Sequence, residues 1–380
     1  MTVCEWILST TARSMLPKDF VVGLAEQLRL AEIPIDCFSF SIRTMHPEVG
    51  AEIALWSLDD GAMLSPKPHG NIQTPKYMNS PVAKIAAGDP GFRQQLVLPI
   101  APHDFPVLRD LQAAGYTDYL IEPLPITQQL RAYVSWSTKA QDGFSEAQIS
   151  SLKSLTPYMT VAVALMSQQS ALVGLLETYL GRHAGRLVRS GQYRRGDGTS
   201  IEAVIWFSDL RGFTSFTDQH TIAQTLQRLN HTFDVIGKAI SDQGGEILKF
   251  IGDAVLAVFP IEANRDEKAA ARSALLAAQE ALKRFREDEI ESDHPIQIGI
   301  GIHKGTVTFG NVGTTSRLDF TVIGSPVNEA ARVEALCKTL NENVLMTEAI
   351  ANLLPEFSLR SLGKHNLRGM SVDRELFGIR

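Results

Sequence analysis

Two stretches in the second half of the chain decide the fold: EAVIWFSDLRGFTSF (202–216) and GGEILKFIGDAVLAVFP (244–260). In the first, an apolar run over 203–207 ends at Ser208-Asp209, and a glycine-containing loop leads into a predicted helix. In the second, Gly252-Asp253 separates two strand-like runs, which is the pattern of a β-hairpin. Each stretch therefore places one aspartate at a strand end, and we expect the two strands to be neighbours.

The two aspartates form a candidate site for metal ions and a nucleoside triphosphate. Asp209 lies beside loop N–H groups and a helix N-terminus, where a cation bridging phosphates is favoured. With Asp253 it could hold two cations about 3.5–4 Å apart, the spacing that activates an attacking oxygen and neutralises a leaving phosphate. The alternative is that both are turn aspartates held by local hydrogen bonds.

The composition is that of an ordinary soluble globular protein. The 380 residues are 44% hydrophobic and 21% charged, which suggests two or three domains, and the net charge of −6 gives no reason to expect nucleic acid. We expect no signal peptide, because Glu5 stands near the start and no basic region precedes a long apolar segment. No run approaches the roughly 18 apolar residues of a membrane span. The three cysteines are not spaced as in metal sites or disulfide frameworks. We therefore expect a cytoplasmic protein.

Residues 1–145 predict a modest α+β domain. The expected elements are a helix over 20–30, strands over 35–42 and 52–56, a loop-like region over 65–79, helices over 81–87 and 105–114, and strands over 116–120 and 131–137. Their order resembles a GAF-type sensor domain, through the pattern alone. No residue there identifies a ligand, so a small molecule, bicarbonate or a protein regulator would all fit.

A long helix and a basic connector join the two halves of the chain. Ser145 is a candidate N-cap, and apolar residues three or four apart then follow over 152–180, interrupted at Gln169, with Pro157 as an early kink. We expect this row of apolar residues, the apolar seam of the helix, either to pair with the same helix of a second copy or to pack against its own domain. The following segment, rich in glycine and arginine over 177–202, is typical of a connector between domains.

Downstream, strands with internal glycines precede a helix with a polar face. The expected elements are helices over 222–240 and 266–285, strands over 297–302 and 306–310 with a turn at 303–305, and final strands over 357–362 and 375–379. Gly299 and Gly301 permit close approach of another backbone or of a ligand. After Ser325, a candidate cap, Asn328 and Arg332 lie on one helical face, where two donors suit a negatively charged transition state. The alternative is a solvated polar face.

Four motifs together resemble the catalytic domain of class III nucleotidyl cyclases, in that family's order and spacing. They are FSDLRGFTSF (207–216), GGEILKFIGDAVLAVF (244–259), GIGIHKGTVTFGNVG (299–313) and DFTVIGSPVNEAARVE (319–334). The resemblance implies a ferredoxin-like cyclase domain over 199–380, preceded by a GAF-like regulatory domain over 1–168 and a helical linker or transducer over 169–198. YLGRHAG (179–185) is similar to the corresponding region of bacterial adenylate cyclases.

The resemblance also assigns roles by position. Asp209 and Asp253 match the family's metal-binding aspartates, which implies Mg²⁺ or Mn²⁺ with two ions per active site. Lys249 and Thr321 match the two purine-selecting positions. This pair implies ATP, because guanylate cyclases typically carry Glu and Cys there. Asn328 matches the residue that orients the ribose.

The remaining assignments concern phosphate. Arg332 matches the residue that stabilises charge on the α-phosphate, and Phe213 and Thr214 are substrate-binding candidates in the loop after the first aspartate. Many members place a phosphate-binding Lys before a glycine near the C-terminus, where this chain has Arg368. Arginine still offers a bidentate contact to phosphate. Arg317 is a weaker candidate for the same kind of contact.

The implied activity is conversion of ATP to 3′,5′-cyclic AMP and pyrophosphate by in-line attack of the ribose 3′-oxygen, regulated by the N-terminal domain. The family builds this site in a homodimer, with metal aspartates from one protomer and purine-selecting and transition-state residues from the other. Two alternatives are a guanylate cyclase and a catalytically silent nucleotide-binding scaffold. Silent members usually lack a metal aspartate or the Asn–Arg pair, and all are present here. A diguanylate-type cyclase would leave the helix of Asn328 and Arg332 unexplained.

Overall fold

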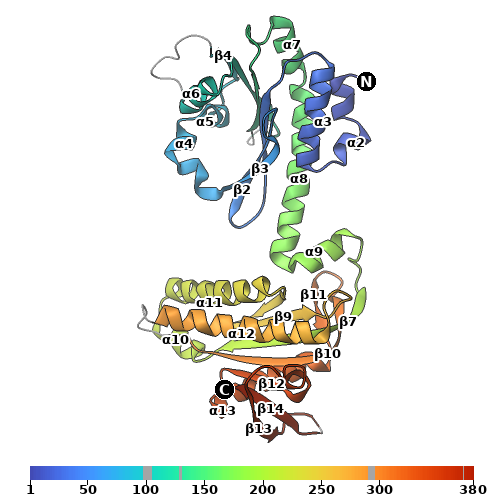
Figure 1. Ribbon diagram of the computed structural model, residues 1–380, viewed down its shortest axis with the longest axis vertical. Helices are drawn as coiled ribbons and strands as arrows, with labels where there is room; N and C mark the ends of the chain where they lie inside the picture. The colour runs from blue at the N-terminus through green and yellow to red at the C-terminus, as the bar shows by residue number, and fades with distance from the viewer. Residues whose placement is uncertain (97–104, 128–130, 290–295, 371) are drawn as a thin grey trace. The chain divides into compact units, whose positions relative to one another are not determined.

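The computed structural model describes residues 1–96, 105–127, 131–289, 296–370 and 372–380 (Figure 1). They form two compact units, Met1–Thr178 and Tyr179–Arg380. Each unit combines helices with a predominantly antiparallel sheet, which confirms the predicted α+β class. The GAF-like identity of the first unit and the bounds of the predicted linker stay predictions.

The first unit is built on a six-stranded sheet with the order β3-β2-β1-β6-β5-β4, in which all neighbours are antiparallel. Alternate side chains enter two different cores, as the period of a strand requires. Phe38 and Phe40 of β1 lie in one core, and Tyr119 and Ile121 of β5 lie in the other. The strands are β1 Cys37–Arg43, β2 Val49–Ser57, β3 Gly61–Pro68, β4 Phe92–Gln95, β5 Asp118–Pro125 and β6 Arg131–Thr138.

Helices cover both faces of this sheet. The core of Phe38 also takes residues from α1 Val3–Ile7, α2 Thr10–Arg13, α3 Pro17–Leu30, α7 Glu146–Ser154 and α8 Thr156–Leu180. The core of Tyr119 takes residues from α5 Pro81–Ala87 and α6 Pro106–Ala113. The predicted loop over 65–79 is wrong in part, since it contains the end of β3, a 3-10 helix His69–Gln73 and α4 Pro75–Met78. Thr74 begins α4 because its hydroxyl accepts from Tyr77 N.

The long helical segment begins and breaks where the sequence indicates. Ser145 is the N-cap of α7, in a capping box with Gln148. The chain leaves α7 at Leu155, just before Pro157, and continues as α8. Among the described residues, α8 is the one helix that is long and apolar enough to cross a membrane by length and composition, and 28% of its apolar stretch is buried. It contains no run of 18 consecutive apolar residues, as expected, because the polar residues 167–170 interrupt its apolar stretch.

The second unit is built on an eight-stranded sheet. Its order is β13-β14-β12-β10-β7-β9-β8, and β11 pairs with the far part of β10. The strands are β7 Gly198–Leu210, β8 Glu246–Ile251, β9 Ala254–Pro260, β10 Ile298–Gly313, β11 Leu318–Ile323, β12 Val344–Thr347, β13 Leu359–His365 and β14 Arg374–Ile379. The predicted hairpin is confirmed, because β8 and β9 are antiparallel partners. Their pairing extends to Ile251 opposite Ala254, and Gly252-Asp253 forms the turn between them.

The strand β10 differs from the expectation. It runs without interruption through His303-Lys304-Gly305, where a turn was predicted, and pairs with β7 from Ile298 opposite Leu210 to Gly310 opposite Gly198. Gly305 is not needed for a turn. A Cβ there would collide with the ring of Pro326, so this glycine makes room for a helix that crosses the strand.

Helices also cover both faces of the second sheet, as the ribbons of α11 and α12 show for one of them (Figure 1). On that face pack α11 Ile222–Asp242 and the alanine-rich α12 Glu267–Glu289. The opposite face takes α9 Arg182–Arg189 and α13 Ser325–Leu340. Two short helices complete the unit, α10 Phe213–Gln219 and α14 Glu348–Ala351.

Glycines bring α13 onto the backbone of β10. A Cβ on Gly301 would collide with Ala330 O and Glu334 N of the helix, and a Cβ on Gly299 would collide with the Glu334 side chain. The prediction that these glycines permit close approach of another backbone or of a ligand is confirmed for a backbone at Gly301, whereas Gly299 makes room for a side chain. The prediction of Ser325 as the cap is wrong, since Gly324 holds the N-cap position and provides no side-chain hydrogen bond.

Candidate active site

Asp209 and Asp253 come together at one end of the second sheet. Asp209 lies near the end of β7 and pairs with Gly299, while Asp253 lies in the turn that enters β9, the neighbour of β7. Burial and the negative charge of Asp253 raise the pKa of Asp209 to about 6, and a side-chain hydrogen bond with Asp253 acts in the same direction. A backbone hydrogen bond at Leu210 opposes this increase in pKa. The two carboxyl groups are thus close enough to disfavour ionisation of both.

These residues fit a hydrated divalent cation. In the described part of the chain, no group of three or more His, Cys, Asp and Glu side chains is arranged to hold a metal. Mg²⁺ suits such a sparse site, because it keeps several waters and usually takes one or two carboxylates together with substrate phosphates. A cation would also relieve the repulsion between Asp209 and Asp253.

Glu334 of α13 is a third carboxyl near the pair, and the sequence did not point to it. Burial and the charge of Asp209 raise the pKa of Glu334 to about 7, with a smaller contribution from Asp253, while Arg211 opposes the increase. The close approach of α13 to Gly299 brings Glu334 to this end of the sheet. Gly299 was the one feature of the sequence that indicated the approach of a distant part of the chain at this end of the sheet.

Asn328 and Arg332 lie on α13, as predicted. Asn328 is exposed and Arg332 is half-buried, in a helix whose Ala330 and Val333 face the core. Arg332 lies beside the predicted phosphate turn, since a Cβ on Gly369 would be 3.5 Å from Arg332 Nη2. Arg368, the preceding residue of that turn, is exposed. The structure therefore brings two candidate phosphate-binding arginines from distant parts of the sequence into one neighbourhood.

Lys249 has a partner that the sequence did not indicate. Its Nζ lies 2.5 Å from Asp319 Oδ2, with 40% of the Lys249 side chain and 50% of the Asp319 side chain exposed. The hydrogen bond from Lys249 lowers the pKa of Asp319, and the charges of Lys249 and Arg317 act in the same direction. Thr321 stands two residues later in β11 and so shares a face of the strand with Asp319. The purine-selecting candidates thus lie on β8 and β11 of one protomer.

The three other candidates lie in different surroundings. Phe213 packs against the core under α11 and α12, at the first residue of α10, which suits a structural role. Thr214 is exposed, and its carbonyl accepts from Thr217 Oγ1. Arg317 is exposed in the turn between β10 and β11.

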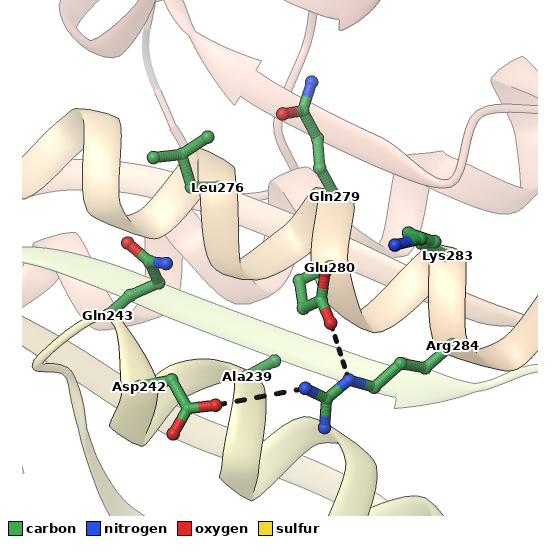
Figure 2. Close-up of a pocket in the computed structure, with 8 residues that line it drawn as sticks. All are labelled: Ala239, Asp242, Gln243, Leu276, Gln279, Glu280, Lys283 and Arg284. Atoms are coloured by element: carbon green, nitrogen blue, oxygen red, sulfur yellow. Dashed lines mark hydrogen bonds and ion pairs between the residues drawn. The ribbon is translucent and has the colours of Figure 1, made fainter.

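A pocket between α11 and α12 is separate from these residues (Figure 2). Its volume is about 320 Å³, and none of the candidate site residues lines it. Arg284 spans it, 2.7 Å from Glu280 and 3.9 Å from Asp242 (Figure 2). Since α11 and α12 cover the face opposite α13, this pocket is not part of the candidate active site.

Known proteins share this arrangement of motifs. Residues 199–377 match the family of adenylate and guanylate cyclase catalytic domains. The second unit is a class III adenylate/guanylate cyclase domain. Its fold is that of a cyclase catalytic domain, and the candidate residues of the cyclase domain all fall inside the matched range.

Several relatives of the cyclase domain are adenylate cyclases. One from Anabaena cylindrica is 41% identical over 177 residues, which cover 44% of this chain and 34% of that protein. The terminal-differentiation specific adenylate cyclase of Dictyostelium discoideum is 35% identical over 182 residues, 46% of this chain and 8% of that protein. The matches thus span about a third or less of these relatives. Among solved structures, the adenylyl cyclase CyaB from P. aeruginosa is 26% identical, with coverage of 48% of this chain and 95% of that one and a TM-score of 0.44.

Proposed function

We propose that this protein is an adenylate cyclase that converts ATP to 3′,5′-cyclic AMP and pyrophosphate. The observation that carries the proposal is the convergence of Asp209 and Asp253 at neighbouring strand ends in a domain whose helix α13 presents Asn328 and Arg332. Two relatives that bear the name adenylate cyclase support it.

The preference for ATP rests on Lys249, Thr321 and Asp319. Adenine presents an acceptor, N1, beside a donor, the N6 amino group, and this order is reversed in guanine. The ammonium group of Lys249 can donate to N1, while an oxygen on the facing strand accepts from N6. Both Thr321 and Asp319 offer such an oxygen on the face of β11 next to Lys249.

The reaction requires three tasks of the side chains. Asp209 and Asp253 would hold the divalent cation, which when bound neutralises the triphosphate and favours deprotonation of the ribose hydroxyl. Asn328 orients the ribose so that its 3′-oxygen faces the α-phosphorus in line with the leaving pyrophosphate. Arg332 stabilises the charge that develops on the α-phosphate, and Arg368 binds the leaving phosphates. The new bond joins O3′ to the α-phosphorus, the bond to the β-phosphate oxygen breaks, and the hydroxyl proton passes to solvent.

We further propose that two copies of the chain build the site and that the first unit regulates it. The complementary halves of the site are present in every protomer, so a homodimer would contain two complete sites. The second half of α8 supports pairing, because Leu172 is 55% exposed and its apolar neighbours are only partly buried. The proposed location of the enzyme is the cytoplasm.

Product analysis tests the function directly. Purified full-length protein is incubated with ATP or GTP and with Mg²⁺ or Mn²⁺, beside Asp253→Ala. We expect cyclic AMP from ATP, and no product from the variant. Cyclic GMP as the main product would refute the ATP preference, and absence of any cyclic nucleotide under all conditions would favour a silent scaffold.

The purine-selecting pair has its own variant. Lys249→Glu combined with Thr321→Cys should shift the ratio of kcat/KM values from ATP towards GTP by about 10-fold or more, since unpaired polar groups reject the wrong base. An unchanged ratio would mean that these residues do not select the base.

A further inference from the structure

A buried carboxylate lies inside the helix that carries Asn328 and Arg332. Glu329 of α13 has only 6% of its side chain exposed. From β14, Arg374 Nε donates to Glu329 Oε1 at 2.6 Å, and Nη2 lies 3.5 Å from Oε2. From β10, His303 Nε2 lies 3.6 Å from Oε2. One side chain therefore connects α13 with two strands.

The partners of Glu329 are themselves held in place. His303 Nδ1 lies 2.9 Å from Thr347 Oγ1 at the end of β12, so four elements meet around one carboxylate. A carboxylate this deeply buried is tolerated only where opposite charge and hydrogen bonds replace its lost hydration. Removal of a single partner would leave an uncompensated charge, which is why the geometry here is strongly constrained.

The same contacts reach the phosphate turn. Arg374 begins β14, and the turn of Arg368 and Gly369 precedes it. Gly369 already lies next to Arg332. Helix α13 thus lies beside the turn at Arg332 and is bound through Glu329 to Arg374, the first residue of the strand that follows the turn. This ion pair fixes direction as well as distance.

Helix α13 needs such a directional contact. Helices ordinarily find their register by packing side-chain ridges into grooves. The strand beneath α13 instead presents Gly299, Gly301 and Gly305, whose lack of side chains lets the helix backbone approach closely. A surface of glycines offers few ridges to stop a helix from sliding or rotating.

We propose that Glu329, through Arg374 and His303, is a positioning residue that sets the orientation of Asn328 and Arg332 relative to the turn of Arg368. The inference rests on the proposed function for its effect on turnover. Its physical basis is that a displacement of about 1 Å in a site of this kind costs on the order of 100-fold in rate. Glu329 itself touches neither substrate nor cation in this account.

Steady-state kinetics of the full-length protein test the effect on turnover. Glu329→Gln and Arg374→Met should each lower kcat by about 10- to 100-fold and leave KM for ATP within about threefold. Arg374→Lys keeps the charge without the bidentate fork and should lie between Arg374→Met and the unaltered protein. Glu356→Gln, which removes the exposed ion pair with Lys268, is the control and should retain full turnover.

The same substitution in a variant that already lacks candidate site side chains distinguishes a positioning effect from general damage to the fold. If Glu329 acts through Asn328 and Arg332, then Glu329→Gln added to a protein that carries both Asn328→Ala and Arg332→Ala should lower its residual kcat by less than about threefold, because coupled residues are not additive. An equal loss in this variant and in the unaltered protein would overturn the proposal, as would a rise in KM that accounts for the whole loss of kcat/KM.

Amide hydrogen exchange supplies a readout that does not depend on turnover. Glu329→Gln should raise exchange in α13 by about 10-fold or more and leave α11 and α12 unchanged. Unchanged exchange in α13 would refute the anchoring role even if turnover fell. If the unaltered protein makes no cyclic nucleotide, the proposed function fails, and the exchange result still decides whether Glu329 fixes the helix.

Discussion

Asp209 shows how single residues of this domain depend on charges that the sequence separates widely. Burial and the charge of Asp253, from the following hairpin, raise the pKa of Asp209, and burial with the charges of Asp209 and Asp253 raises the pKa of Glu334 on α13. Keeping like charges close together costs free energy in the metal-free protein, and a bound cation would reduce that cost.

The pKa of His303, further along β10, shifts in the opposite direction. Burial and the charge of Arg374 lower the pKa of His303 below its ordinary 6.5, and Glu329 opposes them. The unfolded chain therefore takes up this proton first as the pH falls through 6.5. Above pH 6.5, neutral His303 contributes fully to stability. This contribution is lost as the pH falls from 6.5 to the lower pKa of His303 in the folded protein.

Replacement of His303 should therefore flatten the pH dependence of stability. We expect the free energy of unfolding to fall less between pH 7.5 and 5.5 in His303→Gln than in the unaltered protein. Urea unfolding at the two pH values, followed by hydrogen exchange in peptides of the second unit, measures it. Identical pH dependence in the two proteins would show that His303 titrates alike in folded and unfolded chains.

Local chemistry made part of the site predictable at the residue scale. The hairpin turn at Gly252-Asp253 and the polar face of Asn328 and Arg332 follow from neighbours in sequence, and the structure has both. Asp319 and Glu334 could not be found in that way. Their significance comes from Lys249 and Asp209, which lie 70 or more residues away in the chain, so only the folded sheet reveals it.

At the scale of elements, β10 and α13 form the support of the candidate active site. The helix prediction succeeded where apolar periodicity was strong, as in α11 and α12. The turn predicted at 303–305 failed, because a glycine in a strand can serve a crossing helix as well as a turn, and the sequence does not distinguish the two.

The close packing of these elements is testable at Gly301. A Cβ there would collide with the backbone of α13, so Gly301→Ala should lower the free energy of unfolding by about 1–3 kcal/mol. Gly70→Ala is the matched control, since no atom lies within 4 Å of the added Cβ, and it should change stability by less than about 0.5 kcal/mol. Thermal and urea unfolding compare the two, and equal stabilities would contradict the close approach.

The helix α8 carries a prediction of its own. If its second half pairs with another copy, Leu176→Glu should shift the full-length protein from dimer towards monomer and lower turnover, because a charge in an apolar seam is costly. Sedimentation velocity and cyclic nucleotide formation measure the two effects. An unchanged dimer with unchanged turnover would exclude pairing through this seam.

At the scale of the whole molecule, the chain combines a cyclase domain with a separate α+β unit. The family match identifies the second unit, in which the four motifs of a cyclase domain occur together. These motifs contain most of the candidate site residues. The first unit has elements in a suggestive order but no residues that specify a ligand, so its GAF-like character stays a prediction.

We propose that two copies of this chain together build a site that forms cyclic AMP, and complementation between two inactive variants tests this most directly. Asp209→Asn and Arg332→Ala are purified separately, mixed under conditions that exchange subunits, and assayed with ATP. Each variant alone should be nearly inactive. Their mixed dimer should regain one complete site, so that a statistical mixture recovers about a quarter of the unaltered turnover. Exchanged mixed dimers with no more activity than either variant alone would contradict the account.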